Sequence, residues 1–170
     1  MTNTTNNVSM KKGFTMIELI FVIVIIGILA AVAIPRLAAT RDDAKVATCM
    51  DGASSFMTQA TAYYTSQGKL GKISDMTNFS ILTATDGTDK VNGFSADTDL
   101  NTDAAAVNYW CDGGQVMSFT TESNATGFSL TAADVTTGAD AEKVAKNTSD
   151  ALDAKGYYKS YILGGQNIKF

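Results

Sequence analysis

The chain has 170 residues, with 13 Lys and Arg, 17 Asp and Glu, and a formal net charge of −4. This balance argues against a dedicated DNA or RNA binder, which needs a basic face to displace counterions. Histidine is absent, which excludes Ser-His and Cys-His nucleophile pairs and His-ligated zinc sites. The two cysteines are too few for a tetrathiolate metal site, but they are enough for one disulfide.

One uniformly apolar segment lies near the N-terminus. Between Phe14 and Pro35 the only ionisable side chain is Glu18. The run of about 21 residues would form about 31 Å of helix, close to the roughly 30 Å hydrocarbon core of a bilayer. The remaining sequence is polar and rich in small residues, so it could hardly enclose such a helix as a buried core. The segment therefore predicts insertion into a membrane.

The charges that flank this segment predict its orientation. Lys11 and Lys12 stand immediately before it, whereas Arg36 and Arg41 beyond it are soon followed by acidic residues. The positive-inside rule favours an N-terminus in the cytoplasm and an exported body. A cleaved secretory signal is the alternative, but the apolar run is longer than a signal core and lacks a convincing A-x-A exit.

The segment KKGFTMIELIFVIVIIGILAAVAIP resembles the N-terminal signature of type IV prepilins and of the pseudopilins of type II secretion. Gly13, Phe14, Glu18 and Pro35 fall on the four positions that define this signature, although the match covers only about 25 of the 170 residues. The resemblance implies that a prepilin peptidase cuts between Gly13 and Phe14 and that the new amino terminus at Phe14 is N-methylated. It also implies an assembly role for Glu18 and a helix kink at Pro35.

The resemblance further implies the partners and the location of the chain. The partners would be copies of itself and related pilins in a helical filament, the prepilin peptidase, and an inner-membrane assembly platform with an ATPase. The chain would cross the bacterial inner membrane once, with its head in the periplasm, and would then enter a pilus or a periplasmic pseudopilus. No cofactor and no nucleic-acid partner are expected. Met1 and Met10 are alternative starts, and the second would leave the short leader MKKG.

Glu18 has a chemical argument of its own. A carboxylate inside an apolar membrane helix costs on the order of 3 kcal/mol and usually has a partner. Cleavage after Gly13 would create a free amine at Phe14, and a neighbouring subunit staggered along the helix axis could place that amine against Glu18. The alternative interpretation is a tolerated glutamate near the membrane interface, whose carboxylate reaches the lipid headgroups.

After Pro35 the sequence becomes amphipathic, with apolar residues at three- and four-residue steps as far as Tyr64. This pattern predicts that the helix continues to Gln67 and ends at Gly68. We therefore divide the chain into a leader, a membrane or filament-core helix, the amphipathic second half of that helix, and a β-rich head. Their bounds are 1–13, 14–35, 36–67 and 68–170.

The head has the pattern of short strands separated by turns. Strands are predicted at residues 108–111 and 115–121, joined by a hairpin turn at Asp112-Gly113-Gly114. Further strands are predicted at 127–132 and 157–163, and a helix at 139–154. The expected fold class is α+β and pilin-like: a long N-terminal helix packed against a small antiparallel sheet.

The two cysteines, Cys49 on the long helix and Cys111 at the end of a predicted strand, could form a disulfide if the head is exported. Closing this loop would contribute roughly 4 kcal/mol in the chain-entropy model. Two buried free thiols are the alternative. The pair departs from the usual pilin pattern, in which the bridged cysteines enclose a loop near the C-terminus.

Oxygen-bearing side chains alternate in one acidic stretch, at Asp97, Asp99, Asn101 and Asp103. This spacing is typical of calcium-binding loops, and the related major pseudopilins use a calcium site in the head. However, the expected glycine after Asn101 and the closing glutamate are both missing. A solvated acidic turn is the favoured interpretation, and calcium is the alternative.

Two functional classes remain for the whole chain. The first is a structural subunit of a type IV pilus-like filament, either a pilin or a pseudopilin, that is not an enzyme. The second is a membrane-anchored exported enzyme or binding module whose anchor is not cleaved. The lack of histidine and of a paired-acid motif disfavours the second class.

Overall fold

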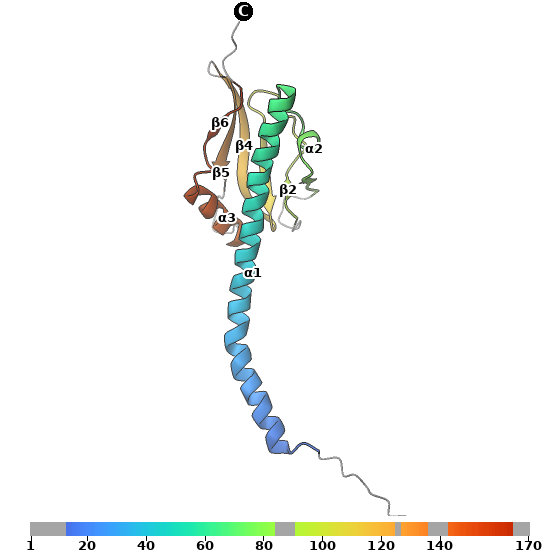
Figure 1. The fold of residues 1–170 in the computed structure, drawn as a ribbon, viewed down its shortest axis with the longest axis vertical. Coiled ribbons are helices and arrows are strands. Elements are labelled where there is room, and N and C mark those ends of the chain that lie inside the picture. Colours follow the sequence, from blue (N-terminus) through green and yellow to red (C-terminus); the bar gives the residue numbers. More distant parts are fainter. Residues whose placement is uncertain (1–12, 84–90, 125–126, 136–142, 165–170) are drawn as a thin grey trace, which may run out of the picture. The chain divides into compact units, whose positions relative to one another are not determined.

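The computed structural model describes residues 13–83, 91–124, 127–135 and 143–164. The chain divides into two units, Met1–Thr40 and Arg41–Phe170, which are described separately. The regular elements, labelled in Figure 1, are α1 (Met16–Gln67), α2 (Ile73–Met76), β1 (Ser80–Ile81), β2 (Gly93–Phe94), β3 (Ala106–Cys111), β4 (Gly114–Asn124), β5 (Gly127–Asp134), α3 (Lys143–Ala154) and β6 (Ser160–Ile162).

The predicted long helix is confirmed as α1. It begins at Met16, two residues after the predicted start, and ends at Gln67 as predicted. Gly68 has a φ of 71° and its N–H donates to the carbonyl of Tyr64 at 2.8 Å. This is how a glycine in the left-handed region ends a helix. The helix is uninterrupted at Pro35, so the kink implied there stays a prediction.

The predicted hairpin is confirmed and forms the centre of the sheet. Cys111 pairs with Gly114, which leaves a two-residue turn at Asp112 and Gly113. Their φ values of 51° and 85° are the left-handed values that a type I′ hairpin turn requires. The observed strands are longer than the predicted ones; β4, for example, continues to Asn124.

Among the described residues, six strands form one sheet in the order β1-β2-β3-β4-β5-β6. The first two strands pair in parallel, and all the other pairs are antiparallel. The part of α1 within the second unit lies along one face of this sheet, and α3 lies on the same side (Figure 1). The expected α+β architecture is therefore confirmed.

The sequence analysis placed some boundaries differently from the structure. The predicted helix at 139–154 is observed as Lys143–Ala154, and residues 139–142 lie outside the described part. The predicted strand at 157–163 is limited to Ser160–Ile162, because Tyr157 and its neighbours form the turn after α3. Strands β1 and β2 and helix α2 were not predicted.

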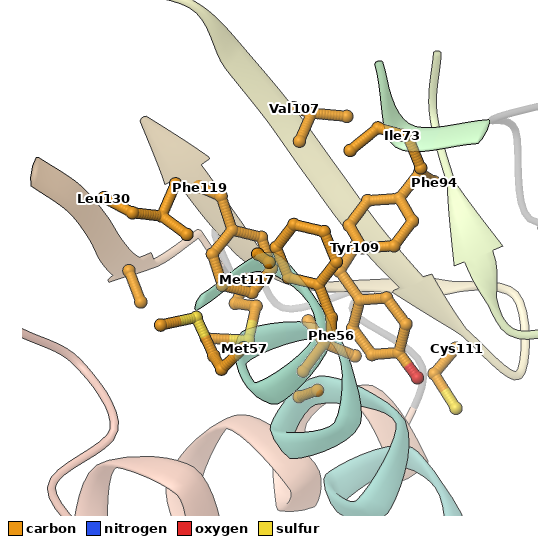
Figure 2. Packing of buried hydrophobic residues seen from close by; sticks show 14 of the residues in the cluster. Phe56, Met57, Ile73, Phe94, Val107, Tyr109, Cys111, Met117, Phe119 and Leu130 are labelled. Atoms are coloured by element: carbon orange, nitrogen blue, oxygen red, sulfur yellow. The ribbon is translucent and has the colours of Figure 1, made fainter. Parts of the chain in front are cut away.

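The hydrophobic core lies between α1 and the sheet. Phe56 of α1 is fully buried, and its ring centroid is 4.6 Å from that of Phe94 and 4.5 Å from that of Phe119. Figure 2 shows these rings together with Tyr109 and Met57, so that one helix face meets the inner sides of β2, β3 and β4. Val144 and Leu152 add α3 to the same cluster.

Candidate functional site

The first candidate site is the N-terminal part of α1. The most apolar 18-residue window of this helix has a mean hydropathy of 3.1, and none of it is buried. In the described part of the chain, α1 is the one helix long and apolar enough to cross a membrane. Its large side chains are exposed, from 42% for Ile25 to 78% for Met16. An apolar surface of this size indicates a partner outside the chain, either lipid or protein.

Glu18 and Thr15 form a capping box at the start of this helix. The side chain of Thr15 accepts the Glu18 N–H at 3.3 Å. In return, one oxygen of the Glu18 carboxylate accepts the N–H and the hydroxyl of Thr15 at 3.2 and 3.1 Å. This reciprocal arrangement satisfies N–H groups at the helix start that have no helical partner. The carboxylate is thus already hydrogen-bonded within its own chain.

The bond between Gly13 and Phe14 lies just before this capping box. Phe14 is 91% exposed, and a side chain placed at Gly13 would meet nothing within 4 Å. The nitrogen of Phe14 is an amide here, because the chain continues into Gly13. The predicted processing residues and Glu18 therefore lie close together at one end of α1. Residues 1–12, which hold the rest of the predicted leader, are outside the described part.

The predicted disulfide is confirmed. Cys49 and Cys111 are bonded, their Cα atoms are 5.8 Å apart, and each residue is 1% exposed. The bond joins α1 to the last residue of β3. The alternative of two free thiols is therefore wrong for this pair.

Two polar contacts flank the disulfide. The Nζ atom of Lys45 lies 2.9 and 2.7 Å from the two carboxylate oxygens of Asp112. The hydroxyl of Tyr109 donates to the carbonyl of Cys49 at 3.3 Å. Tyr109 is fully buried, and this burial, with a smaller contribution from the negative charge of Asp51, raises the pKa of its hydroxyl well above the usual value.

The acidic stretch, for which a solvated turn is the favoured interpretation and a calcium loop the alternative, has exposed carboxylates that accept hydrogen bonds from separate groups. Asp97 accepts both the N–H and the hydroxyl of Ser74 at 2.9 Å, and the N–H donor holds the pKa of Asp97 below its usual value. Asp99 accepts the Asn101 N–H at 2.9 Å, and Asp103 accepts that of Ser123 at 2.7 Å.

No group of three or more His, Cys, Asp or Glu residues that could hold a metal occurs in the described ranges. The hydrogen bonds made by the acidic stretch fix the conformation of the loop. Calcium binding stays the alternative interpretation, and this geometry adds no argument for it.

The sequence analysis missed several of these contacts. The capping box has a clear signal, since Thr15 and Glu18 follow the pattern of a hydroxyl residue three positions before a glutamate. The ion pair between Lys45 and Asp112 spans 67 positions and has no local signal. The same holds for the ion pair at 3.0 Å between Lys143 of α3 and Asp42 of α1.

Comparisons with known proteins agree with the N-terminal signature. Residues 8–34 match the family model described as the prokaryotic N-terminal methylation motif. The chain is also 48% identical over 58 residues to the type IV narrow pilus major component PilA5 of Thermus thermophilus. That alignment covers 34% of this chain and 49% of the relative, so the chain spans about half the length of the curated relative it matches. No solved structure matches the chain.

Proposed function

We propose that this chain, whose N-terminal segment matches the prokaryotic N-terminal methylation motif, is a type IV prepilin and a structural subunit of a type IV pilus-like filament. The observation that carries the proposal is the unburied apolar window of α1, which follows directly after the exposed Gly13–Phe14 bond. In this role the chain is a building block, and no catalytic residue is required of it.

The exposed apolar side chains of α1 need two successive environments. Before assembly, the bilayer surrounds them and removes them from water. In the filament, the same side chains pack against those of neighbouring subunits. Burying one large aliphatic side chain contributes about 1.5–3 kcal/mol, and more than a dozen are exposed here. A helix–helix interface of this kind therefore has ample apolar surface to hold a polymer together.

Glu18 sets the stagger between subunits in this proposal. Once the leader has been removed, Phe14 carries a positive amine, and the amine of one subunit pairs with the Glu18 carboxylate of the next. The capping box supports this step, because Thr15 occupies one carboxylate oxygen and holds the side chain at the helix start. The second oxygen then accepts the amine. Pairing the two charges removes the cost of leaving either one alone in an apolar environment.

Processing and export complete the proposal. A prepilin peptidase hydrolyses the Gly13–Phe14 bond and the new amino terminus is methylated. The subunit waits in the inner membrane, with residues 41–170 in the periplasm, where oxidising conditions suit the disulfide of the head. An assembly platform with its own ATPase supplies the work. The relative's description as a component of a type IV pilus favours a pilus over a secretion pseudopilus.

Two substitutions test this function. Gly13→Ala is expected to leave the chain at full length and unassembled, because the peptidase needs glycine before the cut. Glu18→Gln is expected to be processed but to lose filaments, since its neutral amide cannot pair with the amine. Lys146→Ala, on the exposed side of α3, is the control and should assemble normally. Filaments built from full-length, uncleaved subunits would contradict the proposal.

A further inference from the structure

The disulfide between Cys49 and Cys111 creates a covalent short cut across 62 positions of the sequence. Tension applied between a point before Cys49 and a point after Cys111 passes through the two sulfur atoms. Residues 50–110, which include the end of α1 and strands β1, β2 and β3, are then not stretched. We propose that this disulfide is a mechanical clasp, which shields that segment from tension when the head is pulled against the N-terminal helix.

The inference rests on the proposed function, because a filament subunit is where such tension arises. The first unit of the chain would be held in the filament by its apolar side chains, whereas a surface contact would pull on the head. The connection from α1 into the sheet otherwise runs through Gly68 and the irregular segment that follows α1. The disulfide connects α1 directly to the last residue of β3, beside the turn between β3 and β4.

Noncovalent contacts on both sides of the disulfide support a clasp at this point. Lys45 lies one helical turn before Cys49 and forms an ion pair at 2.7 Å with Asp112, the residue after Cys111. In the other direction along β3, the Tyr109 hydroxyl reaches the carbonyl of Cys49 at 3.3 Å. Three links therefore join Lys45 and Cys49, one turn apart on α1, to the end of β3 and its turn.

Close packing keeps these links in register. A side chain at Gly52, one turn after Cys49, would collide with the hydroxyl of Tyr109. The missing side chain thus allows the tyrosine to lie directly on the helix. Asn92 lies beside the bond, with its amide oxygen 2.7 Å from the sulfur of Cys111. Each cysteine is 1% exposed, although both line an open cavity of about 330 Å³, so we expect reductants to reach the disulfide more slowly in the folded head than in the unfolded one.

Single-molecule force spectroscopy tests the clasp. The unprocessed full chain is held in detergent micelles by handles at its two ends and is stretched in the presence of dithiothreitol. The head should first unfold without releasing the enclosed segment. A second, delayed extension of about 22 nm should follow in the same molecule, as the exposed disulfide is reduced and 62 residue positions extend. This readout requires no substitution.

Two variants show whether the clasp also resists force. The double variant Cys49→Ser with Cys111→Ser should unfold at a lower force, in one step that already contains the additional 22 nm or so. Lys45→Ala is the matched control: it removes the neighbouring ion pair but keeps the bond, so the delayed step must remain. If the wild type releases its full length at once, or if the double variant unfolds at the wild-type force, the inference is wrong.

Filament formation by the same proteins separates this inference from the proposed function. Electron microscopy of cells that express the double variant should still show filaments, because assembly depends on the first unit of the chain. Normal filaments with an unchanged unfolding force would overturn the clasp alone. Absence of filaments from the wild-type chain, together with the delayed step in the force experiment, would overturn the proposed function and leave the covalent short cut intact.

Discussion

The two parts of α1 differ in whether their apolar side chains are buried. Before Arg41, large apolar residues such as Met16, Phe21 and Leu37 are between two thirds and four fifths exposed, at 78%, 67% and 68%. After Arg41, Phe56 is fully buried against the sheet, together with the small residues Ala53 and Ala60. One helix therefore carries two surfaces, and only the second finds its partner within the chain.

The difference follows from the sequence pattern. The first part is apolar all round, and such a helix is stable only inside lipid or a bundle. The second part is apolar at three- and four-residue steps, which gives one stripe that fits a sheet face. Small residues lie on that stripe, and at Gly52 the missing side chain leaves room for the hydroxyl of Tyr109. The first surface serves assembly in our account, and the second holds the head together.

Replacement of one phenylalanine in each part gives the largest expected contrast. Phe56→Ala removes a fully buried ring that contacts Phe94 and Phe119, so the free energy of unfolding of the head should fall by about 3–5 kcal/mol. Phe21→Ala, in the exposed part, should change it by less than about 0.5 kcal/mol. Chemical denaturation followed by Trp110 fluorescence measures both. Equal losses in the two variants would mean that the first part also packs within the chain.

Removal of the disulfide tests how strongly the second part of α1 is held to the sheet. The double variant Cys49→Ser with Cys111→Ser should lose about 2–4 kcal/mol of unfolding free energy, since the unfolded chain regains the freedom that the 62-position loop had removed. Denaturation of the wild type with and without a reductant gives an independent value. A loss below about 0.5 kcal/mol would show that the bond contributes little to the stability of the head.

A pair of glycines in α1 gives a smaller contrast. Gly52→Ala brings a methyl group against the hydroxyl of Tyr109, so overpacking should cost about 1–3 kcal/mol. Gly27→Ala meets nothing within 4 Å and should leave the stability of the head unchanged. Thermal unfolding of both variants tests the contrast. If Gly52→Ala is as stable as the wild type, the helix is not held against β3 as described.

The smallest expected effect concerns Tyr158, whose hydroxyl forms a hydrogen bond with Ser149 of α3 and donates to the carbonyl of Val116 at 3.3 Å. Tyr158→Phe should cost about 1 kcal/mol. Tyr63→Phe is the control, because its hydroxyl makes no hydrogen bond within the described ranges, and its cost should be near zero. Equal costs for the two variants would contradict a structural role for the Tyr158 hydroxyl.

The same tyrosine gives a pH dependence. Burial raises the pKa of Tyr158 to about 12, whereas a tyrosine in the unfolded chain has a pKa of about 10. The unfolded chain therefore loses this proton first as the pH rises. The contribution of the protonated Tyr158 to the free energy of unfolding is fully present below about pH 10 and is lost as the pH approaches about 12. The unfolding free energy of Tyr158→Phe, measured across this range, should fall less steeply than that of the wild type.

The local elements of the fold were predictable from the sequence, and the long-range ones were not. The long helix follows from its periodicity and from Gly68, and the central hairpin follows from Asp112 and Gly113 between two apolar stretches. Strands β1 and β2 are two residues each and pair with distant parts of the chain, so no period-2 pattern marks them. Helix α2, with four residues, is too short for a helical period.

The residues of the candidate site also divide into those that a local motif predicts and those that depend on long-range packing. The processing residues and the assembly role of Glu18 could be predicted because they belong to one contiguous motif, and they stay predictions. The capping box with Thr15 lies in the same stretch. The disulfide could only be expected as one of two states, because its formation depends on how the helix packs on β3. The ion pair of Lys45 with Asp112 depends on that same packing, which no local pattern encodes.

The most direct test of the central proposal is the mass of the subunit recovered from native filaments. Our account predicts a chain that begins at Phe14 with a methylated amine and still carries one disulfide. Recovery of a polymer whose subunits retain residues 1–13, with an unmodified terminus, would contradict it.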